Sequence, residues 1–234
     1  MVAIFVALMF IGFIIIDAIL ERVGARPAAA NPDLARAVAA QRPVLRPVSR
    51  SEWPALPEGV YLSEGHCWLR PQVQGAFQIG PDALVGQALG QVTRVTPPKV
   101  GSETWAGLPL FQVEAGGRTL SVGAPVTGRV VAVNGELQDR PELLVKSPYE
   151  EGWVCALVPS RLVEEKPVWR LGGKALEWFD QEIQRFSQFL WTRYESDLAL
   201  GETSLDGGTP APGSLGAFDA DVWAAFEAEF LRRH

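Results

Sequence analysis

The chain has 234 residues, of which 47% are hydrophobic and eight are tryptophan, and its formal net charge is −6. So many apolar side chains argue against a disordered protein and can fill one sizeable core. The charge is uneven, since residues 1–50 hold six arginines and three acids, which leaves 15 basic and 24 acidic residues for the remainder. An acidic body argues against nucleic acid as a partner, because phosphate binding requires a basic face.

Residues 2–16 form an uncharged apolar run, which Ala18, Ile19 and Leu20 continue beyond Asp17. About 20 helical residues span the hydrocarbon of a bilayer, so residues 1–22 are predicted to be a transmembrane anchor. A cleaved signal peptide is the alternative, but no basic residue precedes the run. Six arginines follow it, which predicts a single-pass protein of the cytoplasmic membrane with its body in the cytoplasm. Asp17 is a candidate for pairing with a partner helix.

Residues 23–58 are rich in proline, alanine and arginine, and they are predicted to be a linker. Within the following segment, residues 108–133 predict a β-hairpin. Strand-like runs flank Gly116 and Gly117, and glycine adopts the positive φ angles of a tight turn. Pro125 and Gly128 then frame a second turn before a β-branched run.

Further motifs surround this hairpin in a fixed order. They are YLSEGHCWLRP (61–71), AFQIGPDALVGQALG (76–90), PVTG (125–128), PEL (141–143) and PYEEGW (148–153). Together they resemble the H protein of the glycine cleavage system, a relative of lipoyl domains, over residues 59–162. The resemblance implies a mainly β fold, a flattened β-barrel or sandwich of two sheets, with the hairpin at one end and a helix alongside.

In that family the hairpin tip holds a lysine that carries lipoate. It lies three residues after a glutamate and eight before the proline of the second turn. Counting from Glu114 and from Pro125 places this position at Gly117, between Gly116 and Arg118. A guanidinium stays protonated and does not accept an acyl group. The departure therefore predicts an H-protein-like domain with no lipoyl group and no other cofactor.

No enzyme is predicted. His66 is the one histidine away from the C-terminus, so the sequence offers neither a histidine-based metal site nor a catalytic triad. We expect His66 to have the structural role that its motif implies. Cys67 and Cys155 form no CxxC pair and are expected to be buried thiols.

The apolar period changes to that of a helix within residues 163–199, with a helix expected over about 173–198. The stripe consists of Leu176, Phe179, Ile183, Phe186 and Leu190. Trp178, Phe189 and Trp191 lie off this stripe and are candidates for binding a protein partner or a membrane interface.

Residues 200–216 have the glycine, proline and serine content of a flexible linker. Residues 217–234 predict a short terminal helix with Phe218, Val222, Phe226 and Phe230 on one side. Such a helix is too short to be stable alone. It is predicted to dock either in a groove of another protein or back on its own barrel.

These features predict a membrane-anchored, non-lipoylated adaptor or structural subunit. It would bind other protein subunits through the transmembrane and C-terminal helices. A working lipoyl or acyl carrier of the glycine cleavage type is one alternative. A membrane-fusion-type adaptor of an export system is another, but it would place the body outside and lacks the usual long α-hairpins. A shared fold does not decide among them.

Overall fold

The computed structural model describes residues 53–165, 167–198 and 210–232, with side chains described up to residue 193 in the long helix. The predicted anchor, Asp17 and most of the predicted linker lie outside these residues. In the described part, no helix combines the length and apolarity that a membrane span requires.

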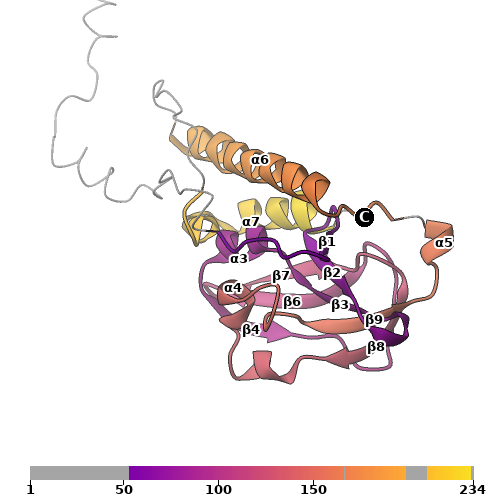
Figure 1. The fold of residues 1–234 in the computed structure, drawn as a ribbon. Helices are drawn as coiled ribbons and strands as arrows, with labels where there is room; N and C mark the ends of the chain where they lie inside the picture. Colours follow the sequence, from indigo (N-terminus) through magenta and orange to yellow (C-terminus); the bar gives the residue numbers. More distant parts are fainter. Residues whose placement is uncertain (1–52, 166, 199–209, 233–234) are drawn as a thin grey trace, which may run out of the picture. The chain divides into compact units, whose positions relative to one another are not determined.

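Antiparallel strands form two sheets (Figure 1). The six-stranded sheet has the order β1 (Tyr61–Leu62), β2 (Cys67–Pro71), β3 (Phe77–Pro81), β9 (Cys155–Pro159), β8 (Gly128–Val133) and β5 (Glu103–Thr104). The three-stranded sheet has the order β4 (Val92–Thr96), β6 (Pro109–Ala115) and β7 (Arg118–Gly123). The predicted mainly β, two-sheet fold is therefore confirmed.

Alternation of side chains explains how the hairpin strands share a core. Val113 on β6 is paired with Leu120 on β7, and both are buried together with Val122. Gln112 and Ser121 form the adjacent pair, and their side chains point the other way. The period of two thus fixes the register of the hairpin, because a slip by one residue would expose its apolar set.

Short helices and turns connect the strands, and longer helices follow them. These elements are η2 (Val73–Gly75), α3 (Ala83–Leu89), η3 (Gly135–Gln138), α4 (Leu143–Lys146), α5 (Leu162–Glu165), α6 (Gly173–Leu198), η4 (Ser214–Ala217), α7 (Ala220–Phe226) and η5 (Glu227–Leu231). Asp82 caps α3 by accepting a hydrogen bond from the Leu84 amide, and Asp219 caps α7 in the same way through Val222. The predicted C-terminal helices are present.

Aromatic side chains pack the C-terminal helices against each other. The Phe186 ring lies 5.3 Å from that of Phe226 and 5.8 Å from that of Phe230. Phe189 lies 5.4 Å from Phe230. All four rings are buried, so each contributes apolar burial of roughly 1.5–3 kcal/mol. In the described structure, the terminal helix packs on its own chain.

This packing corrects the expectation of free aromatic surface. Phe189, Phe218, Phe226 and Phe230 are buried within the chain, whereas Leu176 of the predicted stripe is exposed. The other candidates, Trp178, Trp191 and Val222, are half-buried. The buried face of α6 differs from the predicted stripe because α6 packs against the barrel on one side and against α7 on another. A role in partner binding stays a prediction for Trp178, Trp191 and Val222.

The predicted flexible linker also ends earlier than expected. Gly213 donates a hydrogen bond of 2.7 Å to the Gln87 carbonyl of α3, and Leu215 is fully buried. A Cβ atom at Gly90 would lie only 2.6 Å from the Gly213 Cα. The two glycines therefore permit a close backbone approach that a composition-based prediction of a linker does not detect.

Candidate functional site

The tip of the β6–β7 hairpin is a two-residue turn. Ala115 and Arg118 form the last strand pair, which leaves Gly116 and Gly117 as the connection. Their φ angles are 56° and 73°, the left-handed values that a two-residue hairpin turn of type I′ requires. No atom lies within 4 Å of the position that a Cβ would take at either glycine. The tip is therefore open, and the turn lies where the Gly-Gly pair predicts it.

The residues beside the tip are engaged on both edges of the hairpin. Glu114 lies 3.7 Å from the Arg94 guanidinium of β4. On the other edge, Arg118 donates a 2.7 Å hydrogen bond to the Phe218 carbonyl, and its guanidinium lies 5.5 Å from the Trp223 ring centroid. The hairpin thus holds the C-terminal segment through the residue that follows its tip.

A second contact ties the same strand to the C-terminal segment. The Ser121 amide donates a 2.7 Å hydrogen bond to the Glu227 carboxylate. In the described part of the chain, β7 is an edge strand, and edge amides are otherwise open to pairing with another chain. Arg118 and Ser121 on β7, with Phe218, Trp223 and Glu227 opposite them, are called the clasp below.

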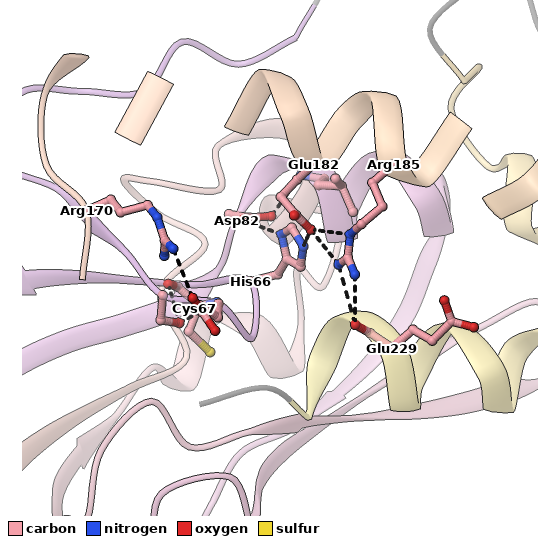
Figure 2. Close-up of polar contacts among 10 residues, drawn as sticks. His66, Cys67, Asp82, Arg170, Glu182, Arg185 and Glu229 are labelled. Atoms are coloured by element: carbon pink, nitrogen blue, oxygen red, sulfur yellow. Dashed lines mark hydrogen bonds and ion pairs between the residues drawn. The ribbon is translucent and has the colours of Figure 1, made fainter. Parts of the chain in front are cut away.

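His66 forms a second polar cluster, which is buried between the barrel and α6 (Figure 2). Its Nδ1 lies 2.8 Å from an Asp82 carboxylate oxygen, and its Nε2 lies 3.2 Å from a Glu182 carboxylate oxygen. The Trp178 ring stacks on the imidazole at a centroid distance of 5.2 Å. Asp82 is fully buried and Glu182 nearly so, so the two carboxylates face one imidazole in a site shielded from water.

The cluster continues to the C-terminal segment. The Arg185 Nε donates a 2.9 Å hydrogen bond to Glu182, and both terminal nitrogens of Arg185 lie 3.4 Å from the Glu229 carbonyl (Figure 2). The guanidinium also lies 3.9 Å from the Phe230 ring centroid. His66, Asp82, Glu182 and Arg185, with the Glu229 carbonyl, are called the histidine cluster below. It connects the residue before β2, the N-cap of α3, α6 and η5.

The electrostatics favour a charged imidazole. Burial alone would lower the pKa of His66, but the Asp82 and Glu182 carboxylates outweigh it and raise the pKa to about 9. Burial would likewise raise the pKa of Glu182, and its contacts with His66 and Arg185 lower it instead. An imidazolium between two carboxylates has no lone pair for a substrate or a metal. Among the described residues, no His, Cys, Asp and Glu group has an arrangement suited to a metal ion.

The contacts of His66 thus support its predicted structural role, but neither Asp82 nor Glu182 is predicted as its partner. The sequence carries a signal for each of these two acids. Asp82 lies directly before an apolar helical run, as an N-cap does. Glu182 falls beside Ile183 and one turn after Phe179, inside the buried stripe of α6. An acid in an apolar stripe requires a basic partner, and the structure provides two, His66 and Arg185.

The cysteines contribute no reactive group. Cys67 and Cys155 are both free and buried, as expected. Burial raises the pKa of Cys155 to about 12 and that of Cys67 well above its usual range. Both side chains therefore remain neutral thiols, which are weak nucleophiles and poor metal ligands. The features that remain for function are the open hairpin tip, the clasp beside it and the exposed surface of the barrel.

The described domain is an antiparallel two-sheet structure with an open two-residue hairpin tip, which is the arrangement that the resemblance to H proteins implies. The family model for the glycine cleavage H-protein matches residues 60–172. A probable glycine cleavage system H protein of Thermococcus gammatolerans is 38% identical over 108 residues, which cover 46% of this chain and 80% of that protein. The glycine cleavage system H protein of Teredinibacter turnerae is 40% identical over 104 residues, or 44% of this chain and 79% of that protein.

A crystal structure of a glycine cleavage system H protein from Mycobacterium marinum aligns with a TM-score of 0.44 and 25% identity, over 54% of this chain and 98% of that one. The two sequence relationships are sufficient to assign the protein to a family. The chain belongs to the glycine cleavage H-protein family, and its H-protein-like lipoyl carrier domain lies within residues 60–172. H proteins are carriers and not catalysts.

Proposed function

We propose that this chain is a member of the family that no longer carries lipoate. In this proposal it serves as an adaptor or structural subunit, anchored to the cytoplasmic membrane by residues 1–22. One observation carries the proposal. The hairpin tip consists of Gly116 and Gly117, and the sequence has no lysine between Lys99 and Lys146. A lipoyl group needs an amine at an exposed tip, and this tip offers none.

The clasp supports the same proposal. Arg118 neighbours the position where the family carries its lysine, and here it binds the Phe218 carbonyl at 2.7 Å. The matched family region ends at residue 172. The segment that occupies the hairpin edge therefore comes from the part of the chain outside this region. A hairpin that holds an appended helix performs a structural task, which requires rigidity where a carrier arm requires freedom.

A second candidate function is the carrier itself. The comparisons support it more directly than they support an adaptor, because both similar relatives described above are glycine cleavage system H proteins that match over most of their length. In this candidate, another residue would have to accept the acyl group. The lysines of the chain are Lys99, Lys146, Lys166 and Lys174, and each of them lies outside the hairpin.

The intact mass of the full-length protein, purified in mild detergent from its native membrane, separates the two candidates. We expect an unmodified mass, together with co-purifying membrane proteins in constant ratio. A mass raised by one lipoyl group would overturn the proposal and establish the carrier. A mass short of the first 30 residues would show that the N-terminal segment is a cleaved signal peptide and would reverse the proposed topology.

A substitution tests whether the missing amine is the cause. We expect Gly117→Lys to gain one lipoyl group when it is produced in cells that lipoylate H proteins. The Cβ has space there, although a left-handed lysine costs about 1–2 kcal/mol. Gly101→Lys is the matched control, since Gly101 also has positive φ and open surroundings but lies outside the hairpin. Modification of the wild type would contradict the proposal, as would equal modification of both variants.

A further inference from the structure

Exposed apolar side chains gather at one end of the six-stranded sheet. The strand pairs Thr104 with Gly128, Gly128 with Pro159, and Phe77 with Pro71 all lie at this end. The turns that leave these pairs, the last part of β9 and the helix α5 that follows it carry exposed apolar residues, which we call the apolar end: Val73, Trp105, Leu108, Val158, Leu162 and Val163. They are six of the eleven large hydrophobic residues exposed in the described chain. A concentration of this kind marks an interaction surface.

Thr127 fixes the turns of the apolar end relative to each other. Its hydroxyl accepts a 3.0 Å hydrogen bond from the Ala106 amide, and its carbonyl accepts one of 3.0 Å from the Ser160 amide. Its own amide donates a 3.0 Å bond to the Glu165 carboxylate at the end of α5. The loop that carries Trp105 and the helix that carries Val163 therefore flank one residue and form a fixed surface.

The exposure at this end is large for apolar side chains. Val73 is 87% exposed, Val163 is 80% exposed and Trp105 is 52% exposed. The described charges nearby nearly cancel: Arg129 pairs with Glu103 at 3.2 Å, exposed Arg161 precedes α5 and exposed Glu164 lies on it, and Glu165 is bonded to the Thr127 amide. The surface is thus a set of protruding, nearly neutral turns with an indole among aliphatic chains. This composition suits the boundary between headgroups and acyl chains.

We infer that the apolar end docks on the surface of a lipid bilayer. This inference rests on the proposed membrane anchoring. Residues 2–20 are apolar apart from Asp17, and 32 residues (21–52) separate them from Trp53, where the described chain begins. A random-coil chain of 32 residues spans about 30 Å on average, and a proline-rich chain in polyproline II spans at most about 100 Å. A body tethered so close meets the bilayer at high effective concentration, so a few apolar side chains are enough to orient it.

Docking by this end also determines where the hairpin lies. β6 runs from Pro109, next to Leu108, to Ala115 at the tip. Seven residues of strand extend about 23 Å. The hairpin tip and the clasp would then face away from the membrane, where a protein partner in the cytoplasm can reach them.

The test uses the full-length protein in vesicles of phosphatidylcholine and phosphatidylglycerol. An environment-sensitive thiol fluorophore is attached to Val163→Cys or, as the control, to Gln138→Cys. Gln138 is exposed in η3, which follows β8 at the opposite end of the sheet. The native Cys67 and Cys155 are buried and do not compete for the label. Quenching by lipids with spin-labelled acyl chains reports contact with the bilayer.

We expect a blue-shifted emission and several-fold stronger quenching at position 163 than at position 138. Adding Trp105→Ser should reduce the quenching at position 163 several-fold while the protein still floats with the vesicles. Flotation with equal quenching at both positions would overturn the inference but leave the anchoring intact. Failure to float would overturn both. A blue shift without vesicles would show that the chain itself covers this surface. A blue shift only with native membrane proteins present would show that a protein covers it. Either result would overturn the inference that this surface docks on lipid.

Discussion

The histidine cluster and the clasp both connect the C-terminal segment to the barrel, but they do so in different surroundings. In the cluster, the His66 and Asp82 side chains are fully buried, and Glu182 is nearly so. In the clasp, Arg118 is half-buried and stacks on an aromatic ring. Removing a partner from the cluster leaves a charge without water, whereas removing the half-buried Arg118 side chain from the clasp admits water to replace it.

This difference indicates that the histidine cluster stabilises the fold and that the clasp is the contact that can be adjusted. The cluster reaches four elements through charged hydrogen bonds, so the barrel and α6 are expected to unfold together. The clasp ties down a segment that enters from residue 210, and its polar contacts lie at the edge of the hairpin, outside the histidine cluster. The hairpin is thus attached to the clasp, whose loss costs less free energy than loss of the cluster. An interaction with a partner can be regulated at such a contact.

The largest effect is expected from His66→Gln. Glutamine keeps hydrogen-bonding capacity but removes the positive charge between Asp82 and Glu182. An uncompensated buried charge of this kind costs about 3–5 kcal/mol. Equilibrium unfolding in urea measures this loss. Arg129→Gln is the control, because it breaks an exposed pair with Glu103 and should cost less than about 1 kcal/mol. Equal losses in the two variants would show that the cluster is not a buried charge network.

A pH dependence follows from the same group. Because the folded protein raises the pKa of His66 from 6.5 to about 9, it binds the proton more tightly than the unfolded chain does. The stabilisation is complete below about pH 6.5 and is lost as the pH rises through about 9, a change of roughly 3 kcal/mol. The groups that face this imidazole are Asp82 at the N-cap of α3 and Glu182 on α6, and Arg185 bonds to Glu182.

Urea unfolding of wild type and His66→Gln across this range isolates the contribution of the histidine. The difference in unfolding free energy between the two proteins should shrink from about pH 6.5 to above pH 9. A constant difference over the whole range would mean that the histidine is neutral when folded, and the cluster would then act only by packing.

The sequence predicts the barrel well because its elements obey local rules. A Gly-Gly pair between alternating strands is sufficient to place the hairpin turn at Gly116 and Gly117, and the structure has it there. The apolar period also predicts α6, which spans Gly173–Leu198. These features depend on neighbours within a few residues, which a single sequence displays directly.

The relations between distant segments were not predictable in the same way. The prediction of a free surface for Phe189 assumes that one apolar stripe faces one neighbour, whereas α6 packs against both the barrel and α7. The His66 and Glu182 pair joins residues 116 positions apart. Arg118 and Phe218 are 100 positions apart. Such contacts depend on how the chain folds back on itself, and the local hydrophobic period does not encode that path.

The smallest effect is expected from Arg118→Gln, and it makes the comparison sharpest. Loss of one hydrogen bond to the Phe218 carbonyl and of the contact with Trp223 should cost about 1–2 kcal/mol. We expect faster amide hydrogen exchange confined to residues 210–232, with the barrel unchanged. Arg94→Gln is the matched control, because Arg94 lies across the same hairpin and pairs with Glu114 in solvent. If exchange also accelerates in β2 and α6, the clasp and the histidine cluster form one cooperative unit, and the hairpin edge cannot be released on its own.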